Sequence, residues 1–244
     1  MTLANVISDL APTGKIRAAI NFGNPVLALK DSVTEQPRGV SVDLSRELSA
    51  RLGVPVEFVT YSAAGKVVDA VTANEWDVAY VAIDPIRGAG IFQTPPYVVI
   101  EGAYLVANSS PICTNDEVDH EGIRVAVGKG SAYDLFLTRE LKRASIVRAP
   151  SSPATVEMMV QQKLEVAAGV RQQLESDARR LSGLRVLDGR FMVINQAMAT
   201  PKGRNAGGEY LHDFVQEMKA SGFVAEALRR NGIEGAAVAP MKGW

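Results

Sequence analysis

The sequence predicts an α/β protein in which one plan of alternating strands and helices occurs twice. Apolar stretches of strand length alternate with amphipathic stretches of helix length, and Gly, Pro and Asn residues mark their ends. A polar, turn-rich stretch at 108–122 interrupts the alternation, which then starts again. A chain of 244 residues is long enough for two small domains. We therefore expect two α/β halves.

The first half predicts a parallel sheet with helices on both faces. A Gly-Asn-Pro turn follows its first strand, and its first helix repeats leucine every fourth residue before a terminal glycine. The strand that begins at Trp76 is apolar along most of its length, as strands buried on both faces are. Helices between parallel strands form right-handed crossovers. The expected elements are strands at 15–22, 54–61, 76–83 and 101–107 and helices at 41–53 and 66–74.

The second half repeats this plan before two helices end the chain. It opens with a strand, a Gly-rich turn and a helix across 123–141. Further strands are expected at 145–149, 165–169 and 193–200, and helices at 152–162, 171–181, 210–220 and 223–230. The second copy of the plan is therefore complete near residue 196.

Composition limits the classes of function. The net charge is −1 and the pI is about 6.2, so no basic surface indicates a nucleic-acid partner. No apolar run approaches the roughly 20 residues that a membrane-spanning helix needs. The one cysteine excludes an internal disulfide, and two distant histidines argue against a Ser-His-Asp triad or a multi-histidine metal site. We expect no metal and no cofactor.

Three loops follow strands at the edge of the sheet where open α/β proteins bind ligands. They are residues 22–27, 84–87 and 128–133. In the third loop, GKGSAY, the N–H groups at a helix start favour an anion, and Ser131 would cap that helix. The same letters also fit a capped helix after a tight turn with no ligand.

Arg87 is the strongest single candidate for ligand binding. It lies in a turn after a buried strand, where a guanidinium can present two donors to a carboxylate. The alternatives are an arginine on the solvated surface and one that is paired with the nearby Asp84.

Four segments, taken in order, resemble family 3 of the bacterial solute-binding proteins of ABC transporters, the polar amino-acid type. They are RGVSVDLSRELSARLGVPVEFV, NEWDVAYVAIDPIRGAGIFQTPPY, GIRVAVGKGSAYDLFL and ATPKGRNAGGEYLHDFVQEMKASGFVAEALRRNGIEG. The resemblance implies the type II periplasmic binding protein fold, with two Rossmann-like lobes joined by two crossing strands and a ligand cleft between them. Lobe 1 would comprise 1–106 and 197–244, and lobe 2 would comprise 107–196.

The resemblance also implies roles for individual residues. Arg87 matches the arginine that clamps the α-carboxylate of the ligand, and Ser131 with the neighbouring Ala132 and Tyr133 would hold the same group from lobe 2. A ligand that contacts both lobes stabilises their closed arrangement by hinge bending. The remaining expected ligand contacts are Asn21, Asn24, Ala82, Asp84, Arg171 and Gln196.

The chain departs from the family pattern at positions that would face the ligand. Asp84 stands where Thr or Ser is usual, and Asn24 and Ala64 replace the aromatic residues that often sandwich the ligand side chain. The acid that usually accepts the α-ammonium group is replaced by Val170, with Arg171 beside it. Since a buried ammonium needs a partner, either Asp84 accepts it or the ligand is not a standard α-amino acid. Asp84 could also occupy Arg87 when the cleft is empty. We expect a small polar carboxylate or amino-acid-like ligand.

Three functions are expected, the first two from this resemblance and the third from the start of the sequence, which lacks the pattern of a secretory signal. The first is a monomeric, non-catalytic binding protein that delivers its ligand to an ABC permease, periplasmic if a leader has been removed. The second is an enzyme like the cyclohexadienyl (arogenate) dehydratases, but Gln172 and Gln173 lie near the place of the required acid, which leaves Asp84 as the substitute. The third is a cytoplasmic ligand sensor without a transporter, if Met1 is the native start.

Overall fold

The computed structural model describes residues 2–241, so Met1 and the segment 242–244 lie outside the described residues. The described chain forms two compact units. Unit 1 contains the residues up to Val99 and those from Asn195 onward, and unit 2 is Ile100–Ile194. Two strands, β6 (Ile91–Ala107) and β11 (Met192–Pro201), contribute residues to both units. The α/β fold class is confirmed.

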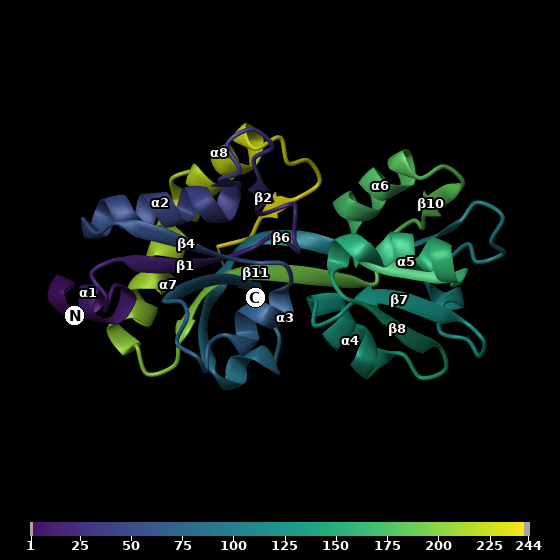
Figure 1. The fold of residues 1–244 in the computed structure, drawn as a ribbon, viewed down its shortest axis with the longest axis horizontal. Coiled ribbons are helices and arrows are strands. Elements are labelled where there is room, and N and C mark those ends of the chain that lie inside the picture. The colour runs from purple at the N-terminus through teal and green to yellow at the C-terminus, as the bar shows by residue number, and fades with distance from the viewer. Residues whose placement is uncertain (1, 242–244) are drawn as a thin grey trace. The chain divides into compact units, whose positions relative to one another are not determined.

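Unit 1 is a mostly parallel sheet with helices on both faces. The strands β4, β1 and β5 run parallel in that order, and β11 pairs antiparallel with β5. In Figure 1, α2 and α8 lie on one face of these strands, and α1, α3 and α7 lie on the other. The strands are β1 (Ile16–Asn21), β4 (Val56–Tyr61), β5 (Val78–Ala82) and β12 (Ala237–Val238), with a separate hairpin of β2 (Leu29–Lys30) and β3 (Pro37–Arg38). The helices are α1 (Leu3–Leu10), α2 (Val40–Leu52), α3 (Ala64–Asp69), α7 (Asn205–Ala220) and α8 (Phe223–Arg230).

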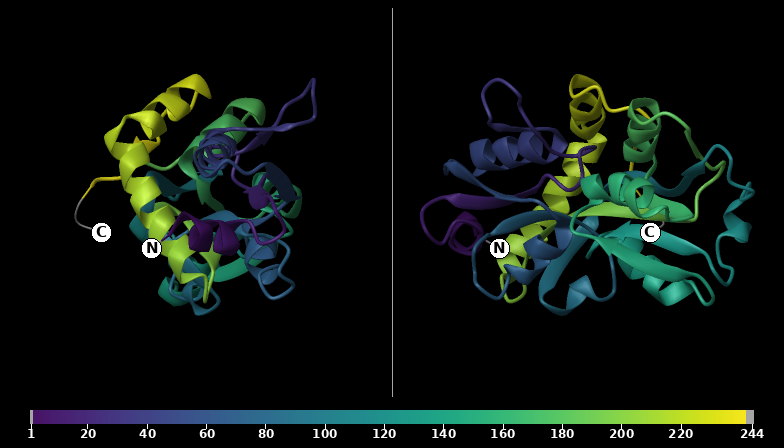
Figure 2. Two further views of the ribbon diagram at one scale, coloured as in Figure 1. Left: turned by 90° about the vertical axis from the view of Figure 1, so that its left-hand side faces the viewer. Right: turned by 45° about the vertical axis from the view of Figure 1, so that its right-hand side comes forward.

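Unit 2 repeats the arrangement on a smaller scale. Its central strand β7 pairs parallel with β8 and β9, and β9 pairs antiparallel with β6. The helix α4 lies on one side of this sheet and α5 on the other, as the views of Figures 1 and 2 agree. The strands are β7 (Arg124–Gly128), β8 (Ser145–Ala149), β9 (Val166–Val170) and β10 (Leu184–Val186), and the helices are α4 (Ala132–Glu140), α5 (Thr155–Gln162) and α6 (Arg171–Arg180). Short 3-10 turns lie at Arg87–Ala89, Asn115–Glu117 and Ser152–Ala154.

Each unit has its own apolar core. In unit 1, Trp76 is buried among small and β-branched side chains, and its indole N–H donates to the carbonyl of Val67 at 2.8 Å. In unit 2, Leu105, Met159 and Leu174 form the corresponding core between the sheet and its helices. Burial of apolar area of this kind is the main favourable term in folding. Each core therefore fixes the loops at the edge of its own sheet.

The N-terminal helix α1 was not expected from the sequence. Thr2 caps it by accepting the N–H of Asn5, and Val6 and Leu10 are buried. The helix packs on α7, which starts at Asn205 and not near 210, and a Cβ on Gly207 would lie 2.7 Å from Cδ2 of Leu10. Glycine lowers helix propensity, but here it permits a close approach between two helices.

The helix expected at 66–74 is shorter and earlier than predicted. In the structure α3 ends at Asp69, and a turn with Asn74 at a positive φ of 52° leads into β5. By contrast, α2 ends where the sequence predicts, because Gly53 adopts the left-handed conformation with φ 65°. The search of residues 2–241 for a helix with the length and hydropathy of a membrane span found none.

Candidate functional site

The turn after β5 is built by Asp84. The strand is buried along its whole length, and the turn follows at Asp84–Arg87. The Oδ1 atom of Asp84 accepts the N–H of Ile86 at 2.9 Å, and its carbonyl accepts the N–H of Arg87 at 3.1 Å. This side chain–backbone bond two residues ahead is an Asx turn. The aspartate that departs from the family pattern therefore also shapes the loop that carries Arg87.

Arg87 is buried rather than solvated, with 3% of its surface exposed. Its Nη1 donates to the carbonyl of Ala82 at 3.1 Å, and Nε2 of Gln93 donates to the same oxygen at 3.1 Å. Burial lowers the pKa of Arg87 to about 10, and the negative charge of Asp84 acts in the opposite direction. The guanidinium is therefore still protonated at neutral pH. The possibility of a surface arginine is excluded.

Three other predicted residues of unit 1 lie on neighbouring strands. Asn21 ends β1, Ala82 ends β5, and Gln196 of β11 is paired in register with Ala82. The side chain of Asn21 accepts the N–H of Gly23 at 2.8 Å, and a Cβ on Gly23 would come within 2.9 Å of that oxygen. Because β1 and β5 are parallel, their carboxyl ends lie at one edge of the sheet. This edge also carries the turn of Arg87.

Asn24 carries a polar atom that the protein does not satisfy. Its Oδ1 is buried and has no hydrogen-bond partner within the described part of the chain. Asn24 follows β1 in the first of the three loops predicted to bind ligand. A buried acceptor without a donor is costly, so this atom is available to a ligand N–H or hydroxyl group.

In unit 2, Ser131 caps α4 as its position predicts. Its Oγ accepts the N–H of Asp134 at 3.0 Å. Ala132 and Tyr133 form the first turn of the helix, whose N–H groups have no intrahelical acceptor. The carboxylate of Asp134 turns back to accept the N–H of Gly130 at 2.8 Å and is also bound by Arg148 at 3.0 Å. Part of the expected anion site is thus used by the protein's own carboxylate.

Sequence reasoning missed Asp134 and Gln93. The signal for Asp134 was present, because an acid three residues after a Ser cap is the spacing of a capping box. Gln93 had no such signal, since its contact with Ala82 depends on where β6 begins relative to β5.

Tyr133 lies in a cluster of hydroxyl groups. It is 3% exposed, and burial raises the pKa of its phenol above the ordinary value, while hydrogen bonds with Ser152, Ser131 and Thr155 act in the opposite direction. Ser152 packs so closely on Gly128 that a Cβ there would lie 2.7 Å from it. The cluster therefore presents neutral donors and acceptors at the carboxyl edge of the unit 2 sheet.

Arg171 is held by acidic residues of its own unit. Its Nε donates to Glu101 at 3.1 Å, and it pairs with Glu175 one helical turn on and donates to the carbonyl of Gly189. The preceding residue, Val170, ends β9 with an apolar side chain. Unit 2 thus has no acid at the position that accepts the ammonium group in the family pattern.

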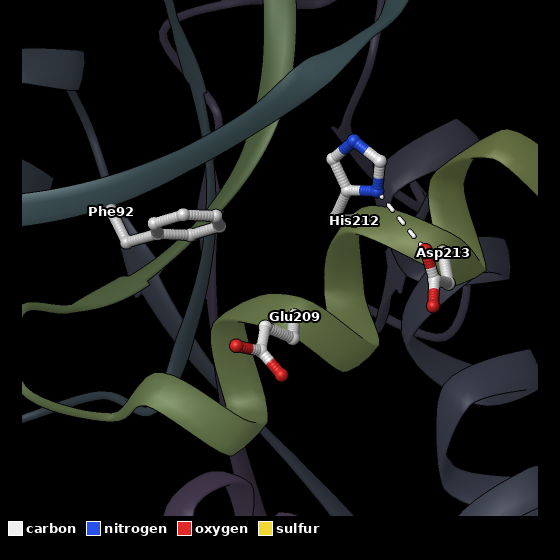
Figure 3. Close-up of a pocket in the computed structure, with 4 residues that line it drawn as sticks. All are labelled: Phe92, Glu209, His212 and Asp213. Atoms are coloured by element: carbon white, nitrogen blue, oxygen red, sulfur yellow. Dashed lines mark hydrogen bonds and ion pairs between the residues drawn. The ribbon is translucent and has the colours of Figure 1, made fainter. Parts of the chain in front are cut away.

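A surface hollow of about 380 Å³ lies elsewhere in unit 1, between α7 and the start of β6. It is lined by Phe92, Glu209, His212 and Asp213, and the imidazole of His212 contacts Asp213 at 3.1 Å (Figure 3). None of the residues predicted to bind ligand lines it.

Comparison with known proteins identifies the family. The model of the bacterial extracellular solute-binding proteins, family 3, matches residues 16–232. The chain belongs to this family. A search of curated proteins found no match. Family 3 proteins are mainly solute-binding proteins. The resemblance to this family that the four sequence segments indicated is confirmed.

Solved structures confirm the fold of this family 3 protein. A mutant of ArgBP from T. maritima has a TM-score of 0.80 at 18% identity, with 94% of this chain and 100% of that chain covered. The solute receptor for L-cysteine of Neisseria gonorrhoeae has a TM-score of 0.81 at 20% identity, with 96% of this chain and 95% of that chain covered. The ancestral amino-acid-binding protein AncCDT-1, a precursor of cyclohexadienyl dehydratase, has a TM-score of 0.78 at 20% identity, with 94% of this chain and 99% of that chain covered.

Proposed function

We propose that this protein captures a small polar carboxylate or amino-acid-like solute and delivers it to an ABC permease. The observation that carries the proposal is Arg87, a protonated guanidinium that is almost wholly buried at the carboxyl end of a central strand. An arginine fork matches a carboxylate in two parallel hydrogen bonds, so a ligand carboxylate is the group that this position suits best.

The remaining predicted residues would surround that carboxylate and its substituents. The carboxyl edge of unit 1 offers Asn21, Asn24 and Gln196, and the first turn of α4 in unit 2 offers backbone N–H groups. Family membership supports binding by both units with closure about the connecting strands. We also propose that the protein acts as a monomer in the periplasm.

A thermal-shift panel of amino acids and organic acids tests this function. At least one carboxylate solute should raise the Tm of the wild type, because a ligand that binds only the folded state stabilises it. Arg87→Ala should abolish that shift. Arg190→Ala is the matched control, since its side chain is 54% exposed and pairs with Glu101. A panel without any shift, or a shift that survives Arg87→Ala, contradicts the proposal.

A dehydratase-like enzyme is the second candidate, because the neighbour AncCDT-1 is described as a precursor of cyclohexadienyl dehydratase. Dehydration of this kind needs an acid that protonates the leaving hydroxyl. Gln172 and Gln173 stand near the expected place, and Gln173 donates to Asp177 at 2.9 Å. A carboxamide cannot supply that proton. Incubation with prephenate or arogenate should therefore yield no aromatic product, and product formation would favour the enzyme.

A sensor role is the third candidate. The sensor domain of a histidine kinase has a TM-score of 0.79 at 19% identity, covering 92% of this chain and 98% of that chain. The permease proposal predicts that the ligand-loaded protein stimulates the ATPase activity of a permease that imports the same solute. The sensor role predicts no such stimulation.

A further inference from the structure

Gln172 is a half-buried residue whose two side-chain amide atoms are both buried and unpaired within residues 2–241. It is the second residue of α6. Its Nε2 and its Oε1 are both buried, and neither has a hydrogen-bond partner among residues 2–241. A buried amide that makes no hydrogen bond has lost its water contacts without compensation.

The next residue makes a sharp contrast. Gln173 is similarly half-buried, but its Nε2 donates to Oδ2 of Asp177 within the same helix at 2.9 Å. Asp177 is in turn bound by Arg180 at 2.9 Å. Of these two adjacent glutamines, Gln173 is therefore engaged in the helix's own contacts and Gln172 is not.

The position of Gln172 places it at the ligand edge of unit 2. Strands β9 and β7 are parallel neighbours, with Val125 opposite Val166 and Ala126 opposite Ala167. The helix α6 starts directly after β9, and the turn capped by Ser131 follows β7. Carboxyl ends of adjacent parallel strands lie at the same edge, so Gln172 and the start of α4 share it.

The charge of its surroundings limits what Gln172 can bind. Val170 is apolar, and the guanidinium of Arg171 is held by Glu101 and Glu175. A carboxamide carries no formal charge, so on its own it cannot balance a buried ammonium or carboxylate. It can donate and accept at once, which matches a hydroxyl, a carbonyl or another carboxamide.

We infer that Gln172 is a specificity-determining ligand contact, which donates from Nε2 and accepts at Oε1 to a neutral hydrogen-bonding group of the solute. This rests on the proposed solute-binding function and narrows its ligand class. The solute is a carboxylate that also carries a hydroxyl, carbonyl or carboxamide group. The cationic and anionic side chains of lysine and glutamate are poor matches.

Calorimetric titration of matched solutes tests the inference. The probes are L-glutamine, L-asparagine, L-serine and L-malate, compared with L-lysine and L-glutamate. A probe of the first group should bind the wild type best. Gln172→Ala should weaken it at least about tenfold, a loss on the scale of one buried hydrogen bond, and Gln173→Ala should change it less than about twofold.

Two further readouts separate ligand contact from structure. Gln172→Ala should leave the Tm of the ligand-free protein unchanged or raise it, because it removes an unsatisfied amide. Gln172→Glu should shift preference toward L-lysine relative to L-glutamine by at least about tenfold, since it adds a negative charge. A structural role would lower the Tm in both variants without changing the preference.

The outcomes distinguish this inference from the function on which it rests. If no probe binds the wild type, both fall together. If a probe binds through Arg87 but the Gln172→Ala variant binds it as the wild type does, only the inference falls. Equal losses in the Gln172→Ala and Gln173→Ala variants would also overturn it, as would L-lysine or L-glutamate binding the wild type best.

Discussion

Asp84 serves two purposes at the scale of a single residue. Its Oδ1 accepts the N–H of Ile86 and so holds the turn, and its charge acts on the neighbouring Arg87. The sequence identifies Asp84 as unusual but cannot show the hydrogen bond, which depends on the backbone of the turn. Both roles follow from one carboxylate next to a buried guanidinium.

Replacing Asp84 by Thr, the residue usual in the family, should separate these roles. The threonine hydroxyl can still accept the N–H of Ile86, while the competing negative charge beside Arg87 is lost. We expect binding of a simple carboxylate such as L-malate to become tighter, because the ligand no longer competes with a protein carboxylate for Arg87. Titration calorimetry measures this, with Asp84→Asn as the isosteric control. Weaker binding in both variants would show that Asp84 itself contacts the ligand.

Only some of the candidate ligand-binding residues can be identified from the sequence alone. Arg87 and Ser131 stand out because a turn after a buried strand and a helix start have recognisable spacing. Gln172 does not stand out, because the sequence shows two glutamines and only the structure distinguishes Gln173, which bonds Asp177. The ligand roles of the ten predicted residues stay predictions.

At the scale of elements, a buried ion network joins α7 to the sheet of unit 1. The carboxylate of Asp77, with a fully buried side chain, is bound by Arg17 of β1 at 2.8 Å and by Arg204 at the start of α7 at 2.6 Å. Arg204 also donates to the carbonyl of Asp9 in α1 at 2.8 Å. Three elements from distant parts of the sequence therefore meet on one carboxylate.

This network should make stability fall in acid. Burial acts to raise the pKa of Asp77, but the hydrogen bonds from Arg17 and Arg204 outweigh it, and the pKa is lowered. A carboxylate with a lowered pKa stabilises the fold above its unfolded pKa of about 3.9, and that stability is lost as pH falls through the folded pKa. The Tm should therefore drop below about pH 4.

Asp77→Ala provides the direct test of the network. Removal of one partner from a buried pair costs about 3–5 kcal/mol, because it leaves the arginines uncompensated. Urea unfolding at pH 7 measures the loss. Glu226→Ala, which breaks the exposed pair with Arg229, is the control and should change the stability little, because solvent screens that pair. An Asp77→Ala loss as small as that of the control would contradict the account.

The contact between α1 and α7 predicts an unusual glycine effect. Gly207→Ala should favour an isolated helix, but its Cβ would lie 2.7 Å from Leu10 and force the two helices apart. We expect a net loss of about 1–3 kcal/mol by urea unfolding. Gly88→Ala is the control, since a Cβ there meets nothing within 4 Å. A Gly207→Ala variant as stable as the wild type would show that α1 can move away from α7 without a loss of stability.

The element-scale errors of prediction have the same origin. Periodicity places α2 correctly because its leucines and its terminal Gly53 are local signals. It misses α1. It also starts α7 too late, because Gly207 and Gly208 have low helix propensity and their close packing on Leu10 and Phe92 appears only in the structure. Tertiary contacts override local propensity at such places.

At the scale of the whole molecule, the repeated alternation of the sequence corresponds to two compact units, each with its own core. The fold class was readable because parallel sheets impose buried strands and intervening helices along the entire chain. Family 3 membership adds the expectation that ligand binding closes the two units, so ligand should reduce the radius of gyration in solution. Small-angle scattering with and without saturating solute measures this, and an unchanged radius would contradict closure.

Carboxylate capture by Arg87 is tested most directly by calorimetric titration of the best-binding solute against three proteins. The wild type should bind it, Arg87→Ala should lose at least about a hundredfold in affinity, and Arg87→Lys should remain weaker than the wild type, because an ammonium keeps the charge but not the two-pronged geometry. The matching amide or methyl ester of the solute should not bind the wild type. Undiminished affinity in the Arg87→Ala variant, or equal binding of the neutral derivative, would contradict the account.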